Sequence, residues 1–238
     1  MVSNTSTFGL LDAGTLLRGE SGEIATWVDR REVIQIWSCL FTVCAGSGLF
    51  GLALGAWRSP MQAVYAGIKF PLVILLTTAG TALLNGMMAP LLGLNIKFRQ
   101  SLLIILFSHT ISAIILGGFS PILLFLIWNA PPVQTASAVS DGHSLVLVVE
   151  VGLIAFAGIL ANLRLRQLLE TLSGSSSVAR RVLLAWLVGN LFFGTQISWL
   201  LRPFVGSPGL PVEFLRPDAF HGNFYEAIFH AVKLLLSS

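Results

Sequence analysis

Charged residues are scarce in this sequence of 238 residues: Lys, Arg, Asp and Glu together make up 11% of it, and hydrophobic residues make up 55%. A soluble domain carries about 25% charged residues. This composition, with a mean hydropathy of +0.82, therefore excludes an ordinary water-soluble fold. The 14 Lys and Arg leave a formal net charge of +3. Because they lie between apolar runs, we interpret them as topology signals and not as a nucleic-acid-binding surface.

Cysteine and the recognised catalytic motifs are also scarce or missing. The two cysteines, Cys39 and Cys44, lie five residues apart in one apolar run, so they point to different sides of one helix and cannot build a disulfide framework. The sequence has no paired-histidine metal motif, no phosphate-binding loop and no acidic cluster. The segment Gly118-Phe119-Ser120-Pro121 ends in the wrong residue for a nucleophile elbow. We therefore expect neither catalysis nor a metal site.

What the sequence has instead is five apolar runs, each near the length of about 20 residues that crosses a bilayer. Lipid cannot satisfy free backbone N–H and C=O groups, so each run is expected to be helical. The predicted fold class is all-α, a polytopic transmembrane helix bundle of about five spans with a C-terminal amphipathic interfacial helix. The predicted spans are Val33–Trp57, Phe70–Leu92, Leu102–Trp128, Leu145–Leu163 and Val182–Leu201.

The basic residues predict how the chain is oriented. Nine lie on the side of the N-terminus: Arg18, Arg30, Arg31, Lys97, Arg99, Arg164, Arg166, Arg180 and Arg181. Five lie on the other side: Arg58, Lys69, Arg202, Arg216 and Lys233. By the positive-inside rule, residues 1–32 form a cytoplasmic segment, 33–201 the membrane domain and 202–238 an outer-face segment. A sixth span at Phe224–Leu236 is the main alternative, but about 13 residues are too short to cross.

The outer-face segment is predicted to be an ordered cap. Prolines and glycines between 200 and 217 favour a compact loop. Asn223 can cap a following amphipathic helix, with Glu226 placed as in a capping box. Arg202 and Arg216 are expected to fasten this cap to loop carbonyls, to Glu213 or to Glu226; contact with lipid phosphates is the alternative. On the cytoplasmic side, the serine-rich segment 173–177 is predicted to be a flexible linker.

One face of the first span carries small residues at intervals of four. Ser47, Gly51 and Gly55 repeat at this spacing, with Gly48 beside them, and such a stripe lets a neighbouring helix backbone approach closely. The neighbour is either another helix of this chain or a second copy.

Two features of the middle spans invite a functional interpretation. Lys69, before Pro71, is expected to extend its ammonium to the lipid headgroups. Gly117, Gly118 and Pro121 are expected to break the third span, as in transporters or in any bent long helix. We predict that His109, just before this break, hydrogen-bonds to another helix; ligation of a haem or a pigment is the alternative.

Further polar residues lie within the fourth and fifth spans. Glu150 is costly at its depth unless it is paired, so a contact with Arg202 or Lys69 is expected, and proton coupling is the alternative. The amides of Asn162, Asn190 and Gln196 are expected to bridge helices.

Several segments resemble an uncharacterised family of bacterial multi-span membrane proteins. They are 198–208 (SWLLRPFVGSP), 214–217 (FLRP), 223–227 (NFYEA), 68–72 (IKFPL) and 94–100 (LNIKFRQ), so the resemblance covers most of the chain after about residue 60. It implies a location in the bacterial cytoplasmic (inner) membrane or a membrane derived from it, and it brings no activity. The five-span count is also loosely similar to Yip1-type membrane proteins.

Three functions fit these observations. The first is a non-catalytic scaffold or accessory subunit that packs against its own copies or other membrane proteins, as the glycine stripe and the missing chemistry suggest. The second is a small-solute or lipid permease that uses the broken third span, with His109 and Glu150 as polar contacts. The third is a haem- or pigment-binding subunit that uses His109. Each has the lipid bilayer as a partner and none involves nucleic acid.

Overall fold

The computed structural model describes residues 10–29, 33–129, 136–206, 210–226 and 233, and within these ranges it is helical, without β-strands. Five long apolar helices are each long enough to cross a membrane, so the chain is a polytopic membrane protein. They are α3 (Val33–Gly55), α4 (Pro60–Leu91), α5 (Phe98–Asn129), α6 (Ala136–Ser173) and α7 (Ser176–Leu201). Two short helices, α1 (Leu10–Arg18) and α2 (Ser21–Asp29), precede them.

The five predicted spans are confirmed as helices, but their ends differ from the prediction. The helix α6 extends beyond its predicted span at both ends, from Ala136 to Ser173, and α4 begins at Pro60 and not at Phe70. Ser59 caps this helix, since its Oγ accepts a hydrogen bond from the backbone N–H of Gln62 at 3.1 Å, and Pro60 occupies the first helical turn, where it costs no hydrogen bond. The length of the apolar run did not predict this start, because Gln62 and Lys69 interrupt the apolar sequence.

The helices α3, α4 and α5 pack through glycines. A Cβ at Gly51 would overlap the carbonyl oxygen of Ala66, and one at Gly55 would overlap that of Gln62, so this stripe lies directly against α4 of the same chain. Gly48 also faces α4, and the Ser47 hydroxyl, which is buried, donates to the Val43 carbonyl one turn earlier.

On its other side α3 crosses α5. A Cβ at Gly117 would lie 2.9 Å from the Cα of Gly46, so these two glycines mark the crossing point. The helix α5 continues from Phe98 to Asn129, so Gly117 and Pro121 do not interrupt it, and the kink expected there stays a prediction. Pro121 removes only one N–H, and the turns on both sides remain helical.

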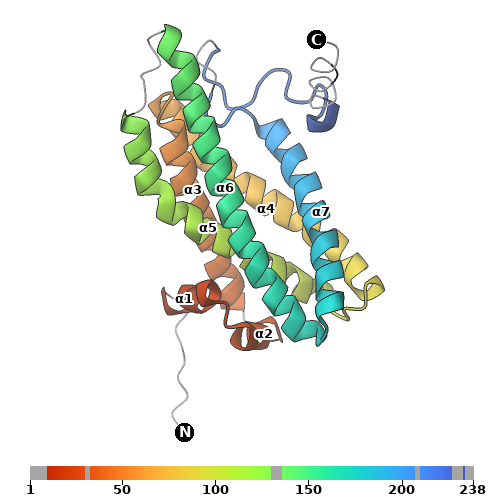
Figure 1. Ribbon diagram of the computed structural model, residues 1–238. Helices are drawn as coiled ribbons and strands as arrows, with labels where there is room; N and C mark the ends of the chain where they lie inside the picture. Colours follow the sequence, from red (N-terminus) through yellow and green to blue (C-terminus); the bar gives the residue numbers. More distant parts are fainter. Residues whose placement is uncertain (1–9, 30–32, 130–135, 207–209, 227–232, 234–238) are drawn as a thin grey trace.

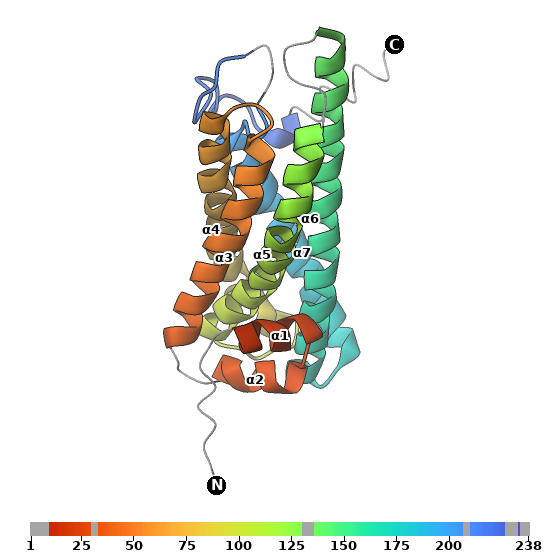
Figure 2. The ribbon, with the colours of Figure 1, turned by 90° about the vertical axis from the view of Figure 1, so that its left-hand side faces the viewer.

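The short helices α1 and α2 lie across one end of the bundle, here called the base (Figures 1 and 2). They bury Leu16, Ile24 and Val28 against the long helices. Trp27 also packs edge-on against Phe107 of α5, with ring centroids 6.3 Å apart. The first 32 residues, predicted only as a cytoplasmic segment, thus contain an amphipathic helix pair docked on the membrane domain.

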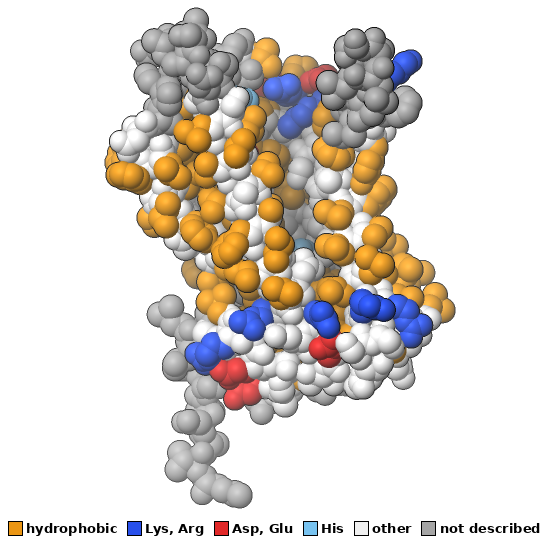
Figure 3. Space-filling view, in the orientation of Figure 1, with side chains coloured by type: hydrophobic (Ala, Val, Ile, Leu, Met, Phe, Trp, Pro, Cys, Tyr) orange, Lys and Arg blue, Asp and Glu red, His pale blue; other side chains and the backbone are white. Residues whose placement is uncertain are grey.

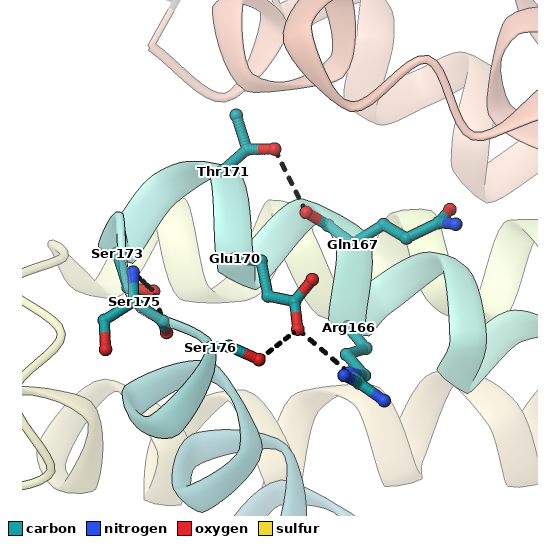
Figure 4. A network of polar contacts seen from close by, with 7 residues as sticks. All are labelled: Arg166, Gln167, Glu170, Thr171, Ser173, Ser175 and Ser176. Atoms are coloured by element: carbon teal, nitrogen blue, oxygen red, sulfur yellow. Dashed lines mark hydrogen bonds and ion pairs between the residues drawn. The ribbon is translucent and has the colours of Figure 1, made fainter.

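The turn between α6 and α7 is ordered at the base (Figure 4). The Ser173 hydroxyl accepts from the Ser175 N–H and donates to the Ser175 carbonyl, while Ser176 donates to Glu170 Oε1 at 2.8 Å. Gly174, with φ 64°, adopts the left-handed conformation that ends α6. The prediction of a flexible linker here is therefore wrong. The run of serines was expected to leave the backbone flexible, but their hydroxyls form hydrogen bonds that hold it in one conformation.

The opposite end of the bundle carries residues 202–206 and 210–226, here called the cap. Asn223 Oδ1 accepts from the backbone N–H of Glu226 at 3.0 Å, so Asn223 does cap a helical turn that begins at Phe224. The amphipathic helix predicted after it falls mostly on 227–232 and 234–238, which lie outside the described residues.

Candidate functional site

A long groove between α6 and α7 is the main concave feature of the membrane domain. In Figure 1 these helices meet at the base and diverge toward the cap, and Figure 3 shows the hollow between them. Two cavities, of about 500 Å³ nearer the cap and about 630 Å³ nearer the base, share five lining residues: Thr77, His109, Ile154, Asn190 and Leu191. The two cavities are neighbours on opposite sides of these shared residues, and together they are here called the groove.

The groove has apolar walls and an apolar rim. The upper cavity is lined by Phe70, Val73, Ile74, Leu116, Phe204 and Phe224, among others. Ile154, Ile159 and Leu191 line the groove and are also 40%, 61% and 58% exposed. Exposed apolar side chains at this level face lipid, so the groove opens sideways toward the hydrocarbon layer.

Polar groups lie halfway along the groove, where α4, α5 and α7 meet. The Thr78 hydroxyl donates to the Ile74 carbonyl at 2.7 Å and is 2.6 Å from His109 Nδ1. The Thr78 hydroxyl has one proton, which it donates to Ile74. In its bond with His109 it therefore accepts, so His109 Nδ1 carries the proton and Nε2 is left as an acceptor. The hydrogen bond joins α4 to α5, which is the kind of contact predicted for His109.

Two further polar atoms at this level have no hydrogen-bond partner in the part of the chain that the structure describes. They are Thr77 Oγ1 and Asn190 Oδ1, and both residues line both cavities. Such groups are costly in an apolar interior unless a ligand or water satisfies them. Both residues line the groove, although the two oxygen atoms themselves are buried beneath its surface.

The polar face of α4 was not predicted from the sequence. Thr77, Thr81 and Asn85 are buried on one side of this helix, with Thr78 beside them. Their spacing of four residues was the available signal, because it places three polar side chains on one stripe of an otherwise apolar span.

The predicted amides are divided between different surroundings. Asn162 lines the lower cavity, where its Nδ2 donates to the Gly158 carbonyl of its own helix at 2.8 Å and so does not bridge helices through that bond. Asn190 lies at the centre of the groove. Gln196, on α7, is outside the linings of both cavities.

Glu150 and Arg202 line the upper cavity but do not pair with each other. Arg202 forms an ion pair with Asp218 of the cap, at 3.1 Å between Nη2 and Oδ2. It also donates to the Trp199 carbonyl at 2.7 Å and stacks 3.8 Å from the centre of the Trp199 ring. The expected contacts of Glu150 with Arg202 or Lys69, and of Arg202 with Glu213 or Glu226, are thus not present among the described residues.

Lys69 does not extend to the headgroups, so that prediction is wrong. Its side chain is fully buried, and its Nζ donates to the Pro203 carbonyl at 2.8 Å and lies 5.1 Å from the centre of the Phe214 ring. Gln62 Nε2, two turns earlier, donates to the Pro203 and Phe204 carbonyls at 3.1 and 2.6 Å. The cap lies over this part of α4 and covers the lysine, so its ammonium finds a carbonyl within the protein.

Arginines lie at both ends of the groove. Arg166 lines the lower cavity, and its Nε pairs with Glu170 at 3.0 Å on the base side (Figure 4). Arg202 occupies the equivalent position near the cap. Arg216, the other arginine predicted for the cap, lines a separate cavity of about 230 Å³ together with Glu213 and Asp218.

No group of three His, Cys, Asp or Glu side chains in the described ranges could hold a metal ion. Comparison with protein-family models, with curated proteins and with solved structures finds no match for this chain. The resemblance to a bacterial membrane-protein family therefore stays a prediction, and the function has to be argued from the groove.

Proposed function

We propose that this protein is a lipid permease, which carries the polar headgroup of an amphiphilic molecule along the groove between α6 and α7. The observation that carries the proposal is that two neighbouring cavities, one lined by Arg202 and the other by Arg166, share Asn190 and His109 between them. A headgroup in this groove meets hydrogen-bonding side chains along its path, while an acyl tail remains in the hydrocarbon layer.

The sideways opening favours a lipid over a water-soluble solute. A solute that enters from water needs a pore closed to lipid, whereas Ile159 and Leu191 form an exposed apolar rim. An amphiphile can enter through such a rim from either leaflet. The Thr77 and Asn190 oxygens, which have no partner among the described residues, then become partners for the headgroup when their side chains turn toward it, so that its desolvation costs less.

The alternative of a scaffold loses one of its supports. The glycine stripe of α3 is occupied by α4 of the same chain, so this face is not available to a second copy. In the other alternative, a pigment- or haem-binding subunit, His109 would have to ligate the cofactor through Nε2. Purified protein should then absorb visible light.

The proposed location is the bacterial inner membrane, with the base and the N-terminus in the cytoplasm. Its support is the distribution of charge, because Lys and Arg side chains gather along the base edge of the apolar surface in Figure 3. The described basic residues at the base are Arg18, Lys97, Arg99, Arg164, Arg166, Arg180 and Arg181. The positive-inside rule places such an end in the cytoplasm.

Two glycines of α6 provide a matched test. A Cβ at Gly158 or at Gly152 meets no atom within 4 Å, but only Gly158 lines the groove. Protein in liposomes should speed the exchange of fluorescent phospholipids between leaflets, measured by dithionite quenching. We expect Gly158→Trp to abolish the acceleration by filling the groove, and Gly152→Trp to keep it. Equal rates for both variants would contradict a route through the groove.

The polar residues provide a second test in the same assay. His109→Ala removes the bond to Thr78, and Glu150→Gln removes the charge in the upper cavity. Both changes should slow lipid exchange. If neither changes the rate while the protein remains folded, these residues do not contact the transported molecule.

A further inference from the structure

We infer that the upper cavity selects a zwitterionic phospholipid headgroup, which carries one phosphate and one ammonium. The inference rests on the proposed lipid-permease function and adds the class of substrate. It starts from the observation that an acidic and a basic side chain, Glu150 and Arg202, line one cavity of about 500 Å³ without pairing.

Arg202 is prepared to bind a phosphate. Its guanidinium is held flat on Trp199, and its side chain is only 17% exposed. Of the five N–H groups of an arginine, three hydrogen bonds are accounted for, to the Trp199 carbonyl and to the Asp218 carbonyl and carboxylate. The donors that remain are Nε–H and one Nη1–H, and each can form a charge-assisted hydrogen bond with a phosphate oxygen.

The charge of Arg202 is only partly neutralised within the protein. Asp218 pairs with it from the cap side, where the Asp218 side chain is 61% exposed, so water weakens this pair. A phosphate that enters from the groove approaches the guanidinium from the less hydrated side, where electrostatic attraction is stronger.

Glu150 provides the complementary position for the ammonium. It belongs to α6 and makes no ion pair with another described residue, although it is at a depth where an unpaired carboxylate is costly. A purely anionic headgroup would meet repulsion from Glu150. A zwitterion satisfies both side chains, with its phosphate on Arg202 and its ammonium on Glu150.

Aromatic residues add to the affinity for an ammonium group. Phe70 and Phe224 line the same cavity. Phe204 lines it too, with its ring centroid 5.1 Å from that of Phe70, but its ring already lies 6.0 Å from the ammonium of Lys69. Aromatic faces attract cations, including the quaternary ammonium of choline. Primary and quaternary ammonium groups therefore share the chemistry that this cavity recognises, and they differ in that only the primary one can donate a hydrogen bond to Glu150.

The test compares three labelled lipids in liposomes of one composition, an equal mixture of phosphatidylcholine and phosphatidylglycerol. Trace phosphatidylethanolamine, phosphatidylcholine or phosphatidylglycerol, each with the fluorophore on an acyl chain, is followed by dithionite quenching. We expect both zwitterionic lipids to cross at least about tenfold faster than phosphatidylglycerol. A faster rate for phosphatidylethanolamine than for phosphatidylcholine would identify hydrogen bonding to Glu150 as the stronger contribution, and the reverse order would identify the aromatic rings.

Two substitutions separate the roles of the charges. Glu150→Gln should reduce the preference for zwitterionic lipids over phosphatidylglycerol to less than about twofold, because the repulsion of the anion is removed. Arg202→Gln should slow all three lipids. If Arg202→Gln fails to fold, Arg202→Lys serves in its place: it keeps the charge that pairs with Asp218 but loses the Nε–H and Nη1–H donors, so it should also slow all three lipids. Arg180→Gln, at an exposed arginine outside the groove, is the control and should change nothing.

The possible failures are distinguishable. Equal acceleration of the three lipids, unaffected by Glu150→Gln, would overturn the zwitterion selectivity and leave a lipid permease. Faster crossing of phosphatidylglycerol would also overturn it. No acceleration of any lipid by folded protein would overturn the permease function and the selectivity together.

Discussion

The two halves of this membrane domain use the same residue type in opposite ways. In α3 and α5, glycines lie against the backbone of a neighbouring helix, so that a single added carbon at Gly51 would overlap Ala66. In α6, a carbon added at Gly152 or Gly158 meets nothing. The half formed by α3, α4 and α5 is therefore a closely packed support, and α6 and α7 with the facing side of α4 and α5 form a groove. Substitutions should affect stability in the first half and transport in the second.

The largest expected effect on stability is that of Gly51→Leu. The leucine cannot be accommodated between α3 and α4 without moving a helix backbone, so the free energy of unfolding should fall by more than about 3 kcal/mol. Thermal unfolding in detergent, followed by size-exclusion chromatography, would measure the change. Gly152→Leu, with open space around it, is the matched control and should stay near the wild type. Because leucine is a better helix former than glycine, helix propensity cannot cause a loss at either position, and similar losses for both variants would mean that the close contact with Ala66 does not determine the result.

The next effect concerns the attachment of the cap to the packed half. Gln62→Leu removes the hydrogen bond to the Phe204 carbonyl, while the Pro203 carbonyl still accepts a hydrogen bond from Lys69. We expect the unfolding free energy to fall by about 1 to 3 kcal/mol, because a buried carbonyl loses its partner. Amide hydrogen exchange within 202–206 and 210–226 should rise. Gln167→Leu, at an exposed glutamine near the base, should leave this exchange unchanged.

Much of the fold could be predicted from the sequence, because the signals for it are local. Run length identified the five spans, and the spacing of four identified the stripe at Gly51 and Gly55. The start of α4 was missed because polar residues interrupt its apolar run, although Ser59 and Pro60 carry a helix-start signal. The helices α1 and α2 were missed because each is only nine residues long and their apolar side chains become buried only after docking.

The candidate site was less predictable, because it depends on contacts between distant residues. Lys69 meets Pro203 across 134 positions of sequence, and no local pattern shows that the cap will cover it. His109 and Glu150 were recognised as polar residues within spans. That they line one groove follows only from the way α6 and α7 diverge, which no local sequence pattern shows. Thr77 escaped notice because a threonine within a span is common, and only its repeat with Thr81 and Asn85 would have identified it.

Two neighbouring threonines of α4, Thr77 and Thr78, allow stability and transport to be tested separately by the removal of one hydroxyl each. Thr78→Val loses the bonds to the Ile74 carbonyl and to His109, so stability should fall by about 1 kcal/mol. Thr77→Val removes a hydroxyl that has no partner among the described residues, so stability should stay constant or rise slightly. Lipid exchange should nevertheless slow in Thr77→Val, because the groove loses a hydrogen-bonding position. A fall in stability for Thr77→Val would show that its hydroxyl serves packing.

The smallest effect is expected at the turn that joins α6 to α7. Ser176→Ala removes one exposed hydrogen bond to Glu170, while the Ser173 and Ser175 bonds and the left-handed Gly174 remain. Exposed bonds of this kind contribute little, so the melting temperature should change by less than about 2 °C. Gly174→Val, by contrast, forces a branched residue into a positive φ and should alter the turn itself. Since this turn joins the two helices that flank the groove, we expect Gly174→Val to change the rate of lipid exchange and Ser176→Ala to leave it unchanged. An equal change in both variants would mean that the Glu170 bond, and not the backbone of the turn, fixes the angle between the two helices.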